Sequence, residues 1–299
     1  MPQFLRWIIF SFVAGLSFLT TSCYKFEGEQ TVPAYLRIEP FEFTADFVTQ
    51  GSNTHKITDA WVYVNDQLIG VYELPATVPV LLAGAQRLDI SPGIKLNGIS
   101  ATRVPYPFYK SFVINSFNFI PDSVQAVKPK TSYQDNLHFA WMEDFEGVSN
   151  SLEKTNSSDT TMLVTSPANS PEAWISPYSS FSGMVKLDTT HKVFQAASFF
   201  SYVLPGKGRP VFLEFDYKCD QEFVVGLIAK TASNNLLLPL VVVNKSDTWN
   251  KIYVNLGSNV TEYNTAEYFK VFFEAILSSQ NKASLYFDNI KLIYRNPSL

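Results

Sequence analysis

The chain of 299 residues has a formal net charge of −4, with 27 acidic and 23 basic residues. This mild acidity argues against nucleic-acid binding, because nucleic acids select basic surfaces. The length is sufficient for two domains. Aromatic residues make up 15% of the chain, while glycine and proline contribute 13 and 17 residues, so the composition indicates a core-forming globular protein. Short runs rich in Phe, Tyr, Val and Ile favour strands over helices.

The first residues have the pattern of an export signal. Arg6 precedes an apolar run over residues 7–19, which is too short to span a bilayer, since a spanning helix needs about 20 residues. Small polar residues at 20–22 then lead into Cys23. This arrangement resembles the bacterial lipobox, in which the cysteine becomes lipidated. The usual branched aliphatic residue three places before the cysteine is Thr20 here, a looser pattern similar to lipoproteins of the Bacteroidetes type.

The lipobox resemblance implies a signal peptide over residues 1–22 and a lipid anchor at Cys23. It places the protein in the bacterial cell envelope as an outer-membrane lipoprotein, on either the periplasmic or the surface face. An ordinary secretory signal with a chance cysteine is the alternative. Residues 23–33 are predicted to be a polar tether. Cys219 would then be the one free thiol, and its alternating strand sequence predicts a buried, inert side chain.

A first β-region is predicted over residues 34–122. A turn at residues 65–66 suits left-handed dihedrals, and Gly84 permits unusual ones. The order of strands and turns, ending in Ser-Pro-Gly-Ile at residues 91–94, resembles PEGA-type and carboxypeptidase-regulatory-like domains. The resemblance implies a small β-sandwich that serves as a spacer or interaction module. Strands are expected at 34–39, 57–64, 67–72, 74–84, 87–94 and 113–120.

Two segments follow the last of these turns. Residues 101–112 are rich in aromatics and prolines, which indicates either a surface patch for a partner or packing of the first domain against the second. Pro-bounded aromatics fill the space between sandwiches well, and this favours packing. Residues 123–137 contain prolines, lysines and few apolar residues, so they are predicted to be the interdomain linker.

The second β-region is predicted over residues 138–296, with a polar surface loop at 148–171. Residues 236–243 are almost continuously apolar, which predicts a strand buried on both faces, with Pro239 indicating a bulge or edge exposure. Strands are expected at 141–147, 183–188, 194–200, 211–218, 223–229, 236–243, 249–256, 268–277 and 283–294, a set that suits a sandwich.

The last of these strands changes its alternation partway along. Leu285 and Phe287 point to one face, and Ile290 and Leu292 continue on that face one residue out of step. An inserted residue produces such a slip, so a β-bulge is predicted at residues 288–289.

Three features of the second region occur in a recognisable order. They are an acidic opening strand at 141–147, a Trp-Asn-Lys-Ile step at 249–252 and a Phe-Asp-Asn-Ile ending at 287–290. This order resembles carbohydrate-binding-module-like jelly rolls, also called galactose-binding-like domains. The expected fold class is therefore all-β, with a small N-terminal β-sandwich followed by a larger jelly-roll β-sandwich.

The jelly-roll resemblance also implies a metal site. In many such modules a calcium ion bridges the opening and closing strands. The matching positions here are Glu143, Glu146 and Asp288, with Asp144 nearby. Calcium takes six to eight oxygen ligands, and carboxylates on adjacent strands could supply several of them. In the alternative, Asp288 caps the bulge and the glutamates are solvated.

The same resemblance implies aromatic rings that stack on sugars. The candidates are Trp174, Tyr178, Tyr253 and Tyr263. Tyr253 alternates with Ile252 and Val254, so it is expected to point away from the core. Packing inside the sandwich is the alternative, because buried aromatics are common in such folds.

The sequence gives little support for catalysis. Its three histidines have no metal-ligand spacing, and it contains no nucleophile elbow, phosphate loop or paired-cysteine motif. A non-catalytic, lipid-anchored protein that binds a glycan is therefore predicted. The alternative is a structural or scaffold lipoprotein that docks other envelope proteins.

Overall fold

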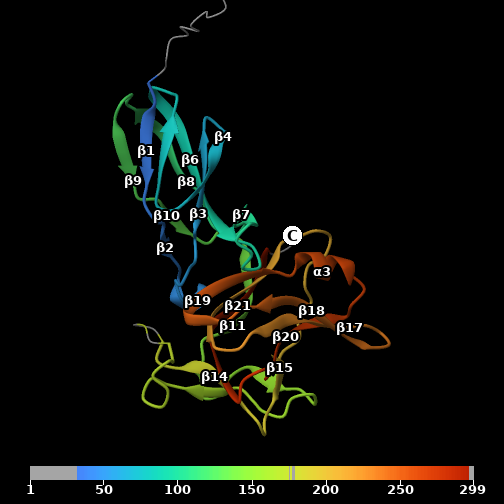
Figure 1. Ribbon diagram of the computed structural model, residues 1–299. Coiled ribbons are helices and arrows are strands. Elements are labelled where there is room, and N and C mark those ends of the chain that lie inside the picture. Colours follow the sequence, from blue (N-terminus) through green and yellow to red (C-terminus); the bar gives the residue numbers. More distant parts are fainter. Residues whose placement is uncertain (1–31, 175, 177–178, 296–299) are drawn as a thin grey trace, which may run out of the picture.

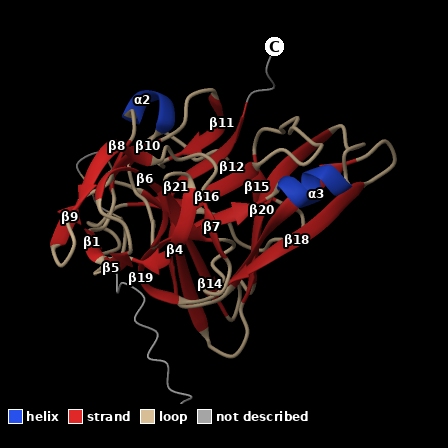
Figure 2. Ribbon diagram, turned by 90° about the horizontal axis from the view of Figure 1, so that it is seen from above, coloured by secondary structure: helices blue, strands red, loops and turns tan. Residues whose placement is uncertain are grey.

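The computed structural model describes residues 32–174, 176 and 179–295, and strands form almost all of its regular structure (Figure 2). The predicted all-β class is therefore confirmed. The helices in the described part are short, α2 at Phe47–Gln50 and α3 at Gly257–Glu262. None of them is long and apolar enough to cross a membrane. Figure 1 shows two sets of strands, with the earlier set above the later one. Cys23 lies outside the described residues.

The first set, here called the first unit, packs two main sheets around one core. A three-stranded sheet has the order β5-β1-β9, and a five-stranded sheet contains β4, β3, β6, β7 and β8. Leu36, Val62 and Ile90 are buried between them. The strands are β1 (Ala34–Ile38), β2 (Glu42–Thr44), β3 (Asp59–Val64), β4 (Gln67–Glu73), β5 (Ala76–Val80), β6 (Gly84–Lys95), β7 (Arg103–Pro105), β8 (Phe112–Phe119), β9 (Val124–Val127) and β10 (Lys130–Ser132).

The predicted linker over 123–137 is wrong, because most of it belongs to the first unit. Strand β9 pairs in parallel with β1, and β10 pairs in parallel with β2. Figure 1 shows green β9 beside blue β1. The lysines that suggested a linker lie on this edge, where Lys128 and Lys130 form ion pairs with Glu42 at 2.5 and 3.2 Å. Charged side chains of this kind are usual on edge strands.

The second set, here called the second unit, packs two antiparallel sheets face to face. One sheet has the order β13-β14-β21-β16-β19 with β11 also on β21, and the other has the order β12-β15-β20-β17-β18. Their core includes Phe215, Phe273 and Phe287. The strands are β11 (Leu137–Glu143), β12 (Leu152–Lys154), β13 (Leu163–Thr165), β14 (Ser182–Asp188), β15 (Val193–Ser198), β16 (Val211–Cys219), β17 (Phe223–Lys230), β18 (Asn235–Val243), β19 (Ser246–Asn255), β20 (Tyr268–Ile276) and β21 (Lys282–Arg295).

Two expectations for the second unit need correction. The predicted loop at 148–171 carries the short strands β12 and β13. Strand β18 is the edge of its sheet rather than a strand buried on both faces, and Leu237 and Val242 are exposed on it. The register of β18 against β17 shifts beside Pro239, in agreement with the bulge or edge exposure predicted from that proline. Apolar residues on an edge strand can be exposed, so a continuous apolar run does not prove burial on both faces.

The single cysteine of the described chain is buried, as predicted. Cys219 lies at the end of β16, and its thiol contacts the carbonyl oxygen of Asn244 at 3.7 Å. Burial raises the pKa of this thiol to about 11. It therefore stays protonated and unreactive at neutral pH.

The predicted bulge in the closing strand is confirmed. Glu214 pairs with Lys291, whereas Asp216 pairs with Asp288, so β21 has one residue more than β16 between these pairs. Within the bulge, Asn289 adopts a positive φ of 50°. Because of the bulge, Lys291 points to the outer face of the sheet while Ile290 stays in the core.

The assignment of β9 to the first unit can be tested with two valines of that strand. Val127 is 8% exposed and Val124 is 65% exposed. Val127→Ala should lower the free energy of unfolding by about 2 kcal/mol through lost burial and the cavity left behind, whereas Val124→Ala should change it little. Urea denaturation followed by circular dichroism measures both. Equal, negligible effects would indicate a linker after all.

Candidate functional site

The outer face of the sheet formed by β16, β19 and β21 carries charged side chains that are covered instead of solvated. Glu214, Lys251 and Lys291 all lie on this face and are buried. A buried charge is strongly unfavourable unless it is paired and hydrogen-bonded. The first unit supplies most of the partners, so the contact between the units is polar as well as apolar.

Glu214 is the centre of this contact. The hydroxyl of Tyr106 donates to its Oε1 at 2.6 Å, and the hydroxyl of Tyr133 donates to its Oε2 at 2.9 Å. Lys251 Nζ lies 3.7 Å from the same carboxylate. Burial, followed by the charge of Glu214, raises the pKa of both tyrosines well above the usual value, so they remain protonated donors.

Two further charged groups join the units beside Glu214. Asp216 accepts a hydrogen bond from the Thr54 hydroxyl at 2.6 Å and lies 3.7 Å from Lys251 Nζ. Lys291 Nζ donates to the backbone carbonyl of Ser52 at 2.6 Å. Burial, then repulsion by Lys251, lowers the pKa of Lys291 to about 7. Segment 52–56 of the first unit is therefore held directly on the second unit.

Tyr253 belongs to this contact, and the prediction that it is an exposed ligand platform is wrong. It does point away from the core of its own unit, as its alternation indicated, but the first unit covers it and leaves it 1% exposed. Its hydroxyl accepts a hydrogen bond from the Lys56 backbone N–H at 2.9 Å and lies 3.1 Å from the Tyr109 hydroxyl. The aromatic segment 101–112 thus packs against the second unit, which is the interpretation that the sequence favoured over a surface patch for a partner.

The connection between β13 and β14 covers another part of the same sheet face. Its Ser170 hydroxyl lies 2.6 Å from the Tyr286 hydroxyl, and its Ser179 hydroxyl donates to Asp288 at 3.1 Å. The backbone carbonyl of Glu172 accepts a hydrogen bond from Trp249 Nε1 at 2.9 Å. The sheet face is therefore covered from two sides, by this connection and by the first unit.

A cleft of about 330 Å³ lies where these two covers meet. We call it the tryptophan cleft, because the half-buried rings of Trp174 and Trp249 meet there edge to face with centroids 5.3 Å apart. The indole N–H of Trp174 has no hydrogen-bond partner among the described residues. Aromatic walls with a few converging polar groups are typical of binding sites for small polar ligands. The cleft is lined by Thr54, His55, Lys56, Trp174, Asp216, Trp249, Asn250 and Lys251.

The four predicted aromatic residues therefore do not form one platform. Trp174 lines the tryptophan cleft, and Tyr253 is buried beneath the first unit. Tyr263 caps the end of α3 and packs against the core of the second unit. Tyr178 lies outside the described residues. Trp249 was not predicted as a site residue, because the Trp-Asn-Lys-Ile step indicates the fold and not a ligand. The adjacent polar residues Asn250 and Lys251 are the signal in the sequence that could have indicated a polar surface there.

The predicted calcium ligands are engaged in separate hydrogen-bond sets. Glu143 accepts from the backbone N–H groups of Phe145 at 2.8 Å and Ser151 at 2.5 Å. Glu146 Oε1 accepts two more backbone N–H groups, those of Ser180 and Phe181, at 2.7 and 2.8 Å.

Asp288 is buried beneath the connection from β13 to β14, and its carboxylate accepts the backbone N–H of Asn289 at 2.7 Å. It therefore caps the bulge, as the alternative interpretation stated. In the described ranges, no group of three or more His, Cys, Asp or Glu side chains is placed to hold a metal ion. Glu143, Glu146 and Asp288 thus belong to separate hydrogen-bond sets, and calcium binding stays a prediction.

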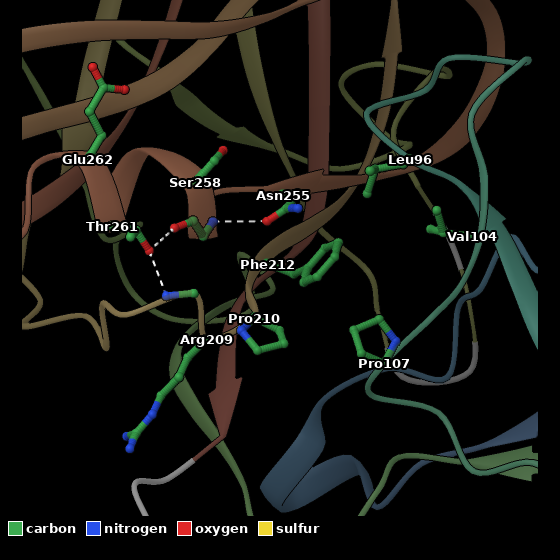
Figure 3. A pocket seen from close by; sticks show the side chains of 12 residues that line it. Leu96, Val104, Pro107, Arg209, Pro210, Phe212, Asn255, Ser258, Thr261 and Glu262 are labelled. Carbon is green, nitrogen blue, oxygen red and sulfur yellow. Dashed lines mark hydrogen bonds between the residues drawn. The ribbon is translucent and has the colours of Figure 1, made fainter.

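A larger cleft of about 720 Å³ lies at another edge of the contact between the units (Figure 3). Leu96, Val104 and Pro107 line it from the first unit, and Phe212 lies at its base with almost no exposed surface. The polar groups near α3 bond to one another. Asn255 accepts from the Gly257 N–H at 2.9 Å, and Thr261 donates to the Gly257 carbonyl at 2.8 Å. Figure 3 shows Arg209 and Glu262 pointing apart.

No protein-family model and no curated protein matches the chain. Solved structures with partial similarity include the CBM22-1 xylan-binding domain from Paenibacillus barcinonensis Xyn10C, at 12% identity and a TM-score of 0.40 over 54% of this chain and 97% of that domain. A second solved structure comes from work on the promiscuous specificity of carbohydrate-binding modules of the β-sandwich superfamily. It has 13% identity and a TM-score of 0.35 over 78% of this chain and 84% of that chain.

The enzymatically active domain of tailspike protein 4 from bacteriophage CBA120 gives 14% identity and a TM-score of 0.38 over 50% of this chain. That match spans 20% of the tailspike domain. At these identities and scores, the similarities assign neither a ligand nor an activity to this chain.

The contact between the units predicts a large effect of one hydroxyl group. Tyr106→Phe removes a donor from the buried Glu214 carboxylate, which no solvent can replace, and should lower the free energy of unfolding by about 2 kcal/mol. Tyr35→Phe, at a half-buried tyrosine of β1, is the control and should have little effect. Urea denaturation measures both. Equal effects of the two variants would contradict the role of Glu214.

The buried carboxyl of Asp288 predicts a specific pH dependence. Burial raises its pKa to about 8, the Asn289 N–H opposes this shift, and the charge of Asp216 adds to it. The folded state thus binds this proton more tightly than the unfolded chain does. The resulting stability is complete below about pH 4 and is lost as the pH rises to about 8.

Asp288→Asn substitutes a neutral amide for this carboxyl. Relative to the unmodified protein, the free energy of unfolding of the variant should rise progressively between pH 4 and pH 8. Urea denaturation at several pH values measures the difference, with Asp247→Asn on the exposed surface as the control. A difference that stays constant over this range would show that Asp288 does not titrate as stated.

Proposed function

We propose that this chain is a non-catalytic glycan-binding protein of the bacterial cell envelope, anchored to the membrane by a lipid at Cys23. The glycan would bind in the tryptophan cleft. The observation that supports this proposal is the meeting of two tryptophan rings with amide, imidazole, ammonium and carboxylate groups in one cleft.

The chemistry of a sugar matches these two kinds of lining. A pyranose ring presents apolar C–H faces, which pack well on the large flat surface of an indole. Its hydroxyl groups both donate and accept hydrogen bonds, and Asn250 offers an amide beside Trp249. Neither feature requires bond making, and the sequence contains no motif for it.

The first unit has a larger role in this proposal than that of a spacer. It contributes Thr54, His55 and Lys56 to the lining of the cleft. Because hydrogen bonds to Glu214 and Asp216 hold the units together, both walls are in place before a ligand arrives. Such preorganisation lowers the entropy lost on binding.

The alternative, a scaffold lipoprotein that docks other envelope proteins, has one observation in its favour. Phe199 and Phe200 follow β15 and are 58% and 62% exposed, and Val203 nearby is also exposed. These residues do not line the tryptophan cleft. Exposed aromatic residues of this kind are enriched where proteins contact one another. Glycan binding that depends on the tryptophan cleft would favour the first proposal.

The proposal is tested by affinity electrophoresis of the purified whole chain against a panel of neutral and acidic polysaccharides. At least one glycan should retard the protein. Trp249→Ala should weaken its binding by about tenfold or more, because a stacking surface is lost. Trp61→Ala is the matched control, since Trp61 is also half-buried but lies in the first unit outside the cleft. No retardation by any glycan, or equal retardation of Trp249→Ala, would contradict the proposal.

A further inference from the structure

Lys56 is fixed at the edge of the tryptophan cleft by two contacts. Its backbone N–H donates to the Tyr253 hydroxyl at 2.9 Å, which holds the main chain on β19. Its ammonium group donates to the side-chain oxygen of Asn250, next to Trp249. The cation therefore lies beside the aromatic wall, although it belongs to the first unit.

The other charged groups around the cleft interact with one another. Lys251 lies 3.7 Å from both Glu214 and Asp216, and Lys291 belongs to the same buried cluster. Lys95, the neighbouring lysine, has its own partner in Glu73 at 3.2 Å. Glu214 and Asp216 are therefore engaged by Lys251 and Lys291, and neither forms an ion pair with Lys56.

The side chain of His55 adds no positive charge to the cleft at neutral pH. Burial and then the charge of Lys251 lower its pKa, with a smaller opposing effect from Asp216. Within the described ranges, no carboxylate forms an ion pair with Lys56, and its ammonium group donates to a neutral amide oxygen. Lys56 is exposed, so its ammonium group is accessible to a ligand, and it is a positive charge of the cleft without a carboxylate partner among the described residues.

We infer that the glycan bound in the tryptophan cleft is acidic, with a hexuronate residue whose ring packs against the tryptophans and whose carboxylate pairs with Lys56. This inference rests on the proposed function and specifies its ligand class. A carboxylate on a sugar would supply the counter-charge that the described residues do not provide, and a charge-assisted hydrogen bond is roughly twice as strong as a neutral one. Because Lys56 comes from the first unit, recognition would require both units.

The inference is tested with the whole chain and paired polymers. Polygalacturonate and alginate carry a carboxylate on each sugar, and their methyl esters keep the same rings without the charge. Binding is measured by tryptophan fluorescence titration and by affinity electrophoresis. At least one acidic polymer should bind about tenfold more tightly than its ester, and added salt should reduce this preference.

Four substitutions separate the contribution of the cation from that of the stacking surface. Lys56→Gln should abolish the preference for the acid over the ester, whereas Lys56→Arg should retain most of it. Lys154→Gln, at an exposed lysine of β12, should leave the preference unchanged. Trp249→Ala should weaken the binding of acid and ester alike, because it removes the stacking surface common to both.

The possible outcomes separate this inference from the proposed function. If a neutral glycan binds in a Trp249-dependent manner and no acidic polymer is preferred, the acidic ligand is wrong and glycan binding stands. The inference is equally overturned if Lys56→Gln retains the preference for acid over ester. If none of the panel polysaccharides or these polymers binds, both are overturned. A preference lost in Lys56→Gln and restored in Lys56→Arg supports the inference.

Discussion

The relation between the two units depends on the burial of one carboxylate. Glu214 lies on the outer face of the sheet of β16, β19 and β21, and the hydroxyls of Tyr106 and Tyr133 bind its two oxygens. An ionised carboxylate removed from water is tolerated only with such donors. The first unit supplies them, so separating the units would leave aromatic surface and a partly desolvated charge without partners. This makes a fixed arrangement more favourable than a flexible one.

The bulge at Asn289 determines which side chains of β21 reach this contact. Without the extra residue, the alternation of the strand would direct Lys291 toward the core and Ile290 away from it. With it, Lys291 binds Ser52 of the first unit, while Asp288 lies beneath the connection from β13 to β14. The bulge therefore sets the direction of the side chains that contact both covers of the sheet face, the first unit and the connection from β13 to β14.

The tryptophan cleft is a consequence of this arrangement. It lies at the boundary between two covering segments that are far apart in the sequence, and each contributes one part of its lining. Trp174 comes from the β13–β14 connection and Lys56 from the first unit, whereas Trp249 comes from the sheet itself. A site built at such a boundary couples ligand binding to the contact between the units, because a ligand that touches both units stabilises their association.

The sequence by itself determined the all-β class, most strand positions, the bulge in the closing strand and the outward direction of Tyr253. These properties follow from local alternation and turn chemistry, which depend on neighbouring residues. Only the tertiary structure decided that β9 and β10 pair with β1 and β2, that Tyr253 is covered, and that Trp249 meets Trp174 beside Lys56. Alternation shows which face of a strand a side chain occupies, but what covers that face is decided by segments remote in the sequence.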